Sequence, residues 1–154
     1  MSNSDFFTHG REALCSGAID WLRDDFRVML VTEAYRPRYE HKSLDRIPVW
    51  ARATDPLPLT GKRIVGGAAD ADDVTFPTAC TDKGNITAII IYRHSDEGEG
   101  YCDLIAVFGK ASTTDDNYGE VKTLSLKPNG QPINITWDDG ENRIFKLPAK
   151  ETPQ

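Results

Sequence analysis

The stretch from Asn85 to Phe108 constrains the fold of this chain more than any other. Its pattern predicts two apolar strands, Ile86–Tyr92 and Tyr101–Phe108, joined by a charged loop that carries two glycines. Both alternating faces of the first strand are largely apolar, which is typical of a strand covered on both sides. The loop has the charge and the glycines that a turn in water needs. We therefore expect a buried hairpin at the core of the fold.

The N-terminal region predicts one short helix, at about residues 5–17. Ser4 or Asp5 can cap its first turn, and Gly17 suits its C-terminal end. Gly10 weakens this prediction, because glycine lowers helix propensity. The chain then alternates into a strand at Phe26–Val31, which has high β propensity.

The middle of the chain predicts short strands separated by turns. Residues 35–48 form a long irregular excursion with one helical turn at Ser43–Arg46, and Val49–Ala53 alternates as an edge strand would. Pairing should stop at Asp55–Pro58, because proline cannot donate to a β ladder. Further strands are expected at Lys62–Val65, before the Gly66-Gly67 pair, and at Asp73–Phe76.

The C-terminal part predicts a last hairpin. Its strands would be Ile133–Trp137 and Arg143–Leu147, with Asp138-Asp139-Gly140 as the turn. Leu124–Leu126 lies before another turn, and residues 148–154 would form a short arm in solvent. Short strands with turns this closely spaced are typical of an antiparallel β-sandwich, jelly-roll-like, here with one N-terminal helix. We expect a single domain over residues 1–154.

Composition narrows the class of protein. The chain has 154 residues, of which 39% are hydrophobic and 27% charged, as in soluble globular proteins. It has no apolar run of the ~20 residues that cross a membrane and no signal-like N-terminus, so we expect it to stay in the cytoplasm. Its net charge of −6 disfavours nucleic acid as a partner. The three cysteines, Cys15, Cys80 and Cys102, are too scattered for a disulfide scaffold or a zinc site, so packed thiols are expected, with a bond between chains as the alternative.

Other polar clusters give no catalytic, cofactor or metal site. Asp70–Asp73 could offer oxygen ligands to calcium, but the cluster lacks the rest of an EF-hand loop, and a solvated turn is favoured. His94, Ser95 and Asp96 contain the side chains of a hydrolase triad, yet sequence neighbours cannot take up its geometry. No glycine pattern matches a nucleotide-binding loop.

One basic segment stands out on this acidic chain. Arginine and tyrosine are favoured at protein interfaces, where a guanidinium can bind carboxylates with two hydrogen bonds. The segment is either a plain solvated loop or a contact for an acidic partner surface. Its interface candidates are Arg36, Arg38, Tyr39, His41, Lys42, Arg46 and Arg52.

A set of strand and turn motifs runs through most of the chain. The first matches are Gly17–Trp21, Asp25–Val31 and Tyr35, and further ones are Leu59–Lys62, Asp72–Phe76, Tyr92, Leu104–Ala106, Ile133–Trp137, Gly140 and Ile144–Phe145. This pattern resembles small virion structural proteins of tailed bacteriophages. In that group a short helix leads through a Gly-x-Ile-Asp turn to a strand of the form K/R-V-x-L-V, followed by a tyrosine. The basic segment and the cysteines depart from the pattern.

The resemblance implies a non-enzymatic part of a phage particle, assembled in the host cytoplasm. The favoured role is a decoration or cement protein on the outer surface of the head, without a cofactor and without nucleic acid or membrane as a partner. Its partners would be the major capsid protein or other virion proteins, and it would be a homo-oligomer or bound to the shell lattice. Such proteins act through weak contacts that the symmetry of the shell repeats.

Three alternatives remain. A neck, collar, tail or fibre-associated protein fits the same motifs. A carbohydrate-binding β-sandwich would need Trp21, Trp50 or Tyr101 as an exposed stacking platform, although Trp50 and Trp137 are expected in the core. A hydrolase would need a cleft that pairs His94 with a distant carboxylate.

Overall fold

Two long antiparallel strands form the centre of the fold. A computed structural model describes residues 4–77, 85–109, 133–135, 137 and 144–146 of the chain. In it, β7 (Ile86–Arg93) pairs with β8 (Asp103–Gly109) from Ala88↔Gly109 to Arg93↔Asp103. The predicted core hairpin is therefore confirmed. Its second strand begins later than expected, because Glu99–Tyr101 forms a 3-10 helix, η4.

This pair belongs to a five-stranded antiparallel sheet in the order β1-β8-β7-β2-β3. Two smaller antiparallel sheets have the orders β10-β5-β4 and β6-β9. The remaining strands are β1 (Ser4–Phe6), β2 (Phe26–Thr32), β3 (Leu57–Pro58), β4 (Arg63–Val65), β5 (Ala68–Asp70), β6 (Val74–Phe76), β9 (Ile133–Ile135) and β10 (Phe145–Lys146). The described chain is thus mainly β, with antiparallel sheets and one α-helix, as predicted.

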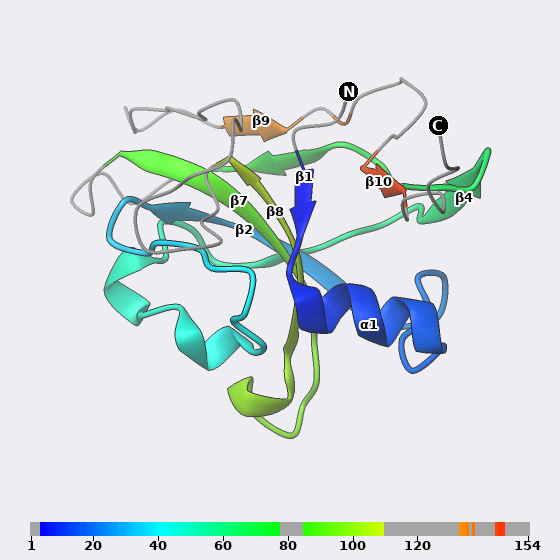
Figure 1. The fold of residues 1–154 in the computed structure, drawn as a ribbon. Helices are drawn as coiled ribbons and strands as arrows, with labels where there is room; N and C mark the ends of the chain where they lie inside the picture. Colours follow the sequence, from blue (N-terminus) through cyan, green and yellow to red (C-terminus); the bar gives the residue numbers. More distant parts are fainter. Residues whose placement is uncertain (1–3, 78–84, 110–132, 136, 138–143, 147–154) are drawn as a thin grey trace, which may run out of the picture.

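Buried side chains cover both faces of the five-stranded sheet. One hydrophobic cluster joins β2, β7 and β8 to β5, β6, β9 and β10. The other joins the opposite face of the same three strands to Tyr35 and to residues 44–51. Figure 1 shows β9 and β10 on one side of the sheet and the irregular segment before β3 on the other. The apolar character of both faces of β7 is explained by these two layers.

The α-helix α1 (Thr8–Ser16) is shorter than predicted. Residues 4–6 pair with β8 instead, so the helix begins after Phe7, which makes no side-chain cap, and neither Ser4 nor Asp5 caps it. Its C-terminal end is as predicted, with Gly17 in the left-handed region at φ 81°. Packing explains why glycine occupies position 10 within the helix: a Cβ on Gly10 would lie 2.4 Å from the Leu104 carbonyl oxygen. The helix thus rests directly on the backbone of β8.

Two predictions for the middle of the chain were wrong. Residues Val49–Ala51 form a 3-10 helix, η2, rather than an edge strand, and only Arg52 bridges to Val31 of β2. Pairing also does not stop at the prolines, since β3 includes Pro58 and pairs with β2. This is possible because β3 lies at the edge of the sheet, where a missing N–H leaves no ladder bond unmade. The helical turn expected at Ser43–Arg46 is present as the 3-10 helix η1 (Leu44–Arg46).

Two further strand assignments need correction. Among the described residues the two C-terminal strands do not pair with each other, because β9 pairs with β6 and β10 pairs with β5. Strand β5 was missed: β4 ends before Gly66-Gly67, as predicted, and these two glycines, both with positive φ, turn the chain directly into β5. Asp70 therefore lies in a strand and is buried, not in a solvated turn.

Several predictions fall outside the described residues. These are the strand at Leu124–Leu126, the turn at 138–140, the arm at 148–154 and the state of Cys80. Among the described residues, no helix combines the length and apolar character that crossing a membrane requires.

Candidate functional site

Residues 36–52, here called the basic segment, are fixed to the sheet by backbone hydrogen bonds. The Leu104 amide donates to the Lys42 carbonyl at 3.0 Å, and the Leu44 amide donates to the Cys102 carbonyl at 2.9 Å. The Thr8 amide, at the start of α1, donates to the carbonyl of Tyr39. These bonds tie the segment to β8 and to the helix, so it is an ordered surface rather than a loose loop.

The inner side of the basic segment is hydrophobic. Leu44, Ile47 and Ala51 are each at most 5% exposed and belong to the cluster that covers one face of the sheet. Two short 3-10 helices carry them, so the apolar side chains point inward while the residues between them face solvent. The sheet thus provides a rigid base for whatever the outer side contacts.

Arg52 belongs to the inner side of the segment. Its side chain is only 17% exposed, and its guanidinium donates to the carbonyl oxygens of Ile47 and Leu44. It also donates to both carboxylate oxygens of Glu99 in η4. This hydrogen bonding raises the pKa of Arg52 and lowers that of Glu99. The structure therefore places Arg52 as a clamp between the basic segment and the β7–β8 loop.

His41 is also turned inward. It is 8% exposed, and its Nδ1 lies 2.7 Å from the hydroxyl oxygen of Tyr35. Burial raises the pKa of Tyr35, so the phenol stays protonated, and the tautomer of the imidazole sets which of the two side chains donates. Burial lowers the pKa of His41, and the charge of Arg46 acts in the same direction. This pair holds the start of the segment against the sheet.

The other interface candidates lie on the outer side of the segment or along its edge. Arg36, Lys42 and Arg46 are exposed. Arg38 is half-buried and pairs with Glu40 at 2.9 Å, and the half-buried Tyr39 packs against the hydrophobic cluster. The structure thus brings the candidates together on one ordered segment and separates them into outward cations and inward anchors.

The same segment carries exposed apolar side chains that its sequence pattern did not predict. Trp50 is 70% exposed and its neighbour Val49 is 65% exposed, so the prediction that Trp50 serves the core was wrong. The 3-10 turn explains the error, because it directs Ala51 inward and leaves Trp50 outside. Tyr101 of η4, the helix to which Arg52 is bonded, is 61% exposed. Large exposed aromatic side chains beside arginines are a composition favoured at protein interfaces.

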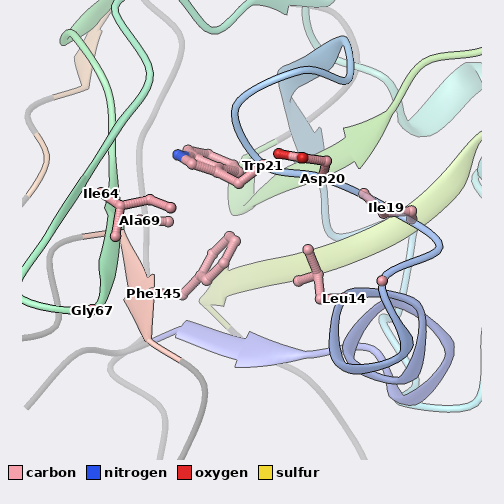
Figure 2. A pocket seen from close by; sticks show the side chains of 9 residues that line it. Leu14, Ile19, Asp20, Trp21, Ile64, Gly67, Ala69 and Phe145 are labelled. Carbon is pink, nitrogen blue, oxygen red and sulfur yellow. The ribbon is translucent and has the colours of Figure 1, made fainter.

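Trp21 serves the scaffold. It is 6% exposed, and its indole N–H donates to the carbonyl oxygens of Arg63 and Asp70. Its ring meets that of Phe145 edge-on, with centroids 5.2 Å apart. Figure 2 shows both rings in an apolar hollow of about 280 Å³, with Leu14 and Ile19 on one side. An exposed stacking platform cannot include Trp21. Trp137 is buried, as predicted.

The aspartates at 70–73 are used by protein groups. Arg63 donates to the carboxylates of Asp70 and Asp72, both at 3.1 Å. The Trp137 amide donates to the carboxylate of Asp73 at 3.1 Å. Within the described part of the chain, no group of three or more potential metal-binding side chains is arranged to hold an ion. These carboxylates join the smaller sheets.

His94 and Asp96 form a pair, but Ser95 does not extend it. His94 Nε2 lies 2.9 Å from Asp96 Oδ1, whereas the Ser95 hydroxyl oxygen accepts from the Glu97 amide. The pair lies in the turn after β7 and lines a cavity together with Tyr92. The histidine there is oriented by a sequence neighbour rather than by a distant carboxylate.

The cysteines differ in their surroundings. Cys102 is buried, and its thiol contacts the backbone of the β7–β8 loop, with Ser95 N at 3.3 Å from Sγ. Cys15 is free and exposed, so the prediction of a packed thiol was wrong for this residue. It faces solvent on α1 because the buried side of that helix is formed by Gly10 and by Leu14.

Comparison with known proteins does not supply a relative. No family model, no curated protein and no solved structure matches this chain. Statements about its function therefore rest on its own residues and their arrangement.

Proposed function

We propose that this chain is a non-enzymatic structural protein of a bacteriophage virion. Its favoured role is that of a decoration protein on the outer surface of the head. The observation that carries the proposal is the outer side of the basic segment. There, exposed cations and the exposed Trp50 are displayed on a base that the sheet holds rigid. A preorganised surface of this kind loses little conformational entropy on binding.

The residues that carry the phage resemblance support this division of labour. Gly17 ends α1, Ile19 and Trp21 are buried, and Asp20 accepts hydrogen bonds from the turn that follows. These residues build the scaffold. The basic segment, which departs from the family pattern, supplies the surface. A shared scaffold with its own surface suits a protein whose partner differs from one particle to another.

The charge of the segment suggests the chemistry of the partner. Arg36, Lys42 and Arg46 face solvent on a chain whose net charge is −6. An acidic patch on the major capsid protein would be attracted to this segment and repelled by the rest of the molecule. This difference sets the orientation of the bound protein and raises its association rate. Copies bound at symmetric positions would add weak contacts over the shell.

The fold proposal is a jelly-roll-like sandwich within a single domain. It is supported by the hydrophobic cluster that joins the five-stranded sheet to both smaller sheets. An experimental structure of the whole chain tests this: the two smaller sheets must belong to one layer that faces the five-stranded sheet.

A co-sedimentation assay with purified phage particles tests the function. The protein is mixed with empty heads, tails or isolated fibres, and the bound fraction is measured at low and high salt. We expect saturable binding to heads that weakens with salt. Binding to tails or fibres alone would replace the head assignment by a neck, collar, tail or fibre role, and failure to bind any of them would refute the proposal.

Two variants localise the contact. Lys42→Glu with Arg46→Glu reverses the exposed charge of the segment and should weaken binding roughly tenfold or more. The control is Arg11→Glu with Arg23→Glu, which makes the same change of charge at exposed positions away from the segment. Equal loss of binding in both would show that net charge matters and the segment does not.

A carbohydrate-binding role is the second candidate, because Trp50 and Tyr101 are exposed aromatic side chains. If their rings stack on sugars, glycan-array binding must be lost in Trp50→Ala or Tyr101→Ala. Unchanged array signals in both variants would remove this candidate.

A further inference from the structure

A cavity lined by apolar surface and by several charged side chains lies at the end of the central sheet, on the side of the basic segment. Its volume is about 370 Å³, within the range of small-molecule sites. Strands β2 and β7 supply Arg27 and Tyr92, which are cross-strand neighbours. The turn after η2 and the β7–β8 loop supply Arg52 and Glu99, whose ion pair closes one wall.

Tyr92 brings an unpaired polar group to this cavity. The residue is 1% exposed, yet within the described part of the chain no group makes a hydrogen bond with its hydroxyl. Buried hydroxyls are nearly always hydrogen-bonded, so this one calls for a partner that the described residues do not supply, such as a bound ligand. Burial raises its pKa to about 12, and the hydroxyl interacts electrostatically with Arg27 and Arg52. The Tyr92 hydroxyl therefore stays protonated and can donate a hydrogen bond to a ligand acceptor.

The charges around the cavity are compensated. Arg52 pairs with Glu99 at 2.8 Å, and Arg27 pairs with Asp25 at 3.0 Å. His94 lies 2.9 Å from Asp96. Because both arginines have a carboxylate beside them, an anionic ligand would have to compete with that carboxylate. A neutral ligand need not.

The same pairs offer donors and acceptors together. Asp25 accepts from Nε and one terminal nitrogen of Arg27, so a guanidinium with five N–H groups retains others for a ligand. The carboxylates of Asp96 and Glu99 can accept from ligand hydroxyls. A molecule with several neighbouring hydroxyl groups, each both donor and acceptor, matches this arrangement.

We propose that this cavity binds a neutral, hydroxyl-rich ligand of about one sugar ring. Tyr92 donates to a ligand oxygen, Arg27 donates to a second, and the carboxylates of Asp96 and Glu99 accept from its hydroxyls. The site is distinct from the outer surface of the basic segment, and its occupancy does not depend on a virion role.

The test is ligand-observed NMR of the full chain with neutral monosaccharides at millimolar concentration. Glucose, galactose, mannose and N-acetylglucosamine are compared with glucose 6-phosphate and glucuronate as charged counterparts. We expect saturable binding of at least one neutral sugar and weaker binding of its charged counterpart. Absence of binding by every neutral sugar, or preference for the charged forms, would overturn the proposal.

Tyr92→Phe isolates the hydroxyl, with Tyr101→Phe as the matched control outside the cavity lining. We expect Tyr92→Phe to weaken sugar binding roughly tenfold, as loss of one hydrogen bond does, and Tyr101→Phe to leave it unchanged. Because no described residue makes a hydrogen bond with the hydroxyl, Tyr92→Phe should also keep or raise the Tm of the free protein. Undiminished binding in Tyr92→Phe, or a clear fall in its Tm, would contradict the role given to this group.

A glycan array distinguishes two sources of the sugar. Binding to immobilised glycans that end in the preferred sugar, lost in Tyr92→Phe, identifies the terminal residue of a polysaccharide. Binding of the free sugar without array binding identifies a soluble monosaccharide, and either result supports the site.

Discussion

Arg52 donates to both carboxylate oxygens of Glu99, with both N···O distances at 2.8 Å. The two residues are far apart in the sequence, and their pair connects the end of η2 to η4. The same guanidinium also donates to the carbonyl of Ile47. The side chain of Arg52 therefore joins the basic segment to the β7–β8 loop and also lines the cavity that contains Tyr92.

Replacing Arg52 should cost more than replacing its partner. We expect Arg52→Ala to lower the free energy of unfolding by about 2–3 kcal/mol, because it leaves the carbonyl of Ile47 without its charged donor. Glu99→Ala should cost only about 1 kcal/mol, since Glu99 is half exposed and solvent screens the pair. Urea unfolding of both single variants and the double variant measures this. A coupling energy as large as the whole Arg52→Ala effect would show that Arg52 acts through Glu99 alone.

Gly10→Ala should destabilise the protein although alanine favours helices. The added Cβ would lie 2.4 Å from the Leu104 carbonyl oxygen and 2.6 Å from the Ile105 Cα, so helix and strand must separate. The expected net loss is about 1–3 kcal/mol, as in other overpacked cores. Thermal unfolding checks it, with the exposed Glu12→Ala as a control that should change stability by less than about 0.5 kcal/mol. An increase in Tm for Gly10→Ala would refute the close contact.

His41 should make the fold sensitive to mild acid. Its folded pKa lies below the usual 6.5, so below pH 6.5 the unfolded chain binds a proton that the folded chain does not. Stability is therefore unaffected by His41 above pH 6.5 and falls as the pH drops below it. His41→Asn retains an acceptor for Tyr35 and should flatten the curve between pH 6.5 and 4.5. Below 4.5, the usual value for Glu99, loss of the Arg52 pair adds to the decline.

The measurement for His41 is urea unfolding of parent and variant across that pH range. Parallel curves from pH 6.5 to 4.5 would show that the buried imidazole takes up its proton as readily in the folded chain. A difference confined to pH values above 6.5 would contradict the sign of the shift.

Truncation of Trp21 and of Trp50 should have very different effects on stability. Trp21→Ala removes a buried ring and two hydrogen bonds to carbonyls, and we expect a loss of about 3–5 kcal/mol. Trp50→Ala removes a side chain that is 70% exposed and should change stability by less than about 0.5 kcal/mol. Chemical unfolding followed by circular dichroism distinguishes them. A large loss of stability for Trp50→Ala would show that this residue serves the fold and does not face a partner.

Local patterns in the sequence were enough to predict the elements whose environment is uniform along their length. β7 was found because apolar residues occupy both of its faces, each of which is buried, and β2 was found because its residues alternate and have high β propensity. Gly17 was found because the end of a helix requires a backbone conformation that glycine adopts easily. The interface candidates lie on one segment because they are close in sequence, and their role at an interface stays a prediction.

The missed features depend on contacts between distant residues. The alternation at 49–53 suits a strand equally well, and only the packing of Ala51 under the segment selects a 3-10 turn. β9 and β10 were expected to pair because they are neighbours in sequence, whereas each finds its partner in the smaller strands before β7. The cavity at Tyr92 needs groups from four separate parts of the chain. A local sequence pattern cannot predict that these four parts of the chain meet.

Strand β3 borders the five-stranded sheet with only two residues, one of them Pro58. A proline at this position offers no N–H to an incoming strand, and so short a border gives a second copy little backbone to extend. On this side, the molecule is protected against growing into a continuous ribbon with its neighbours. Its associations there must be made by side chains, which leaves their specificity open to change by single substitutions.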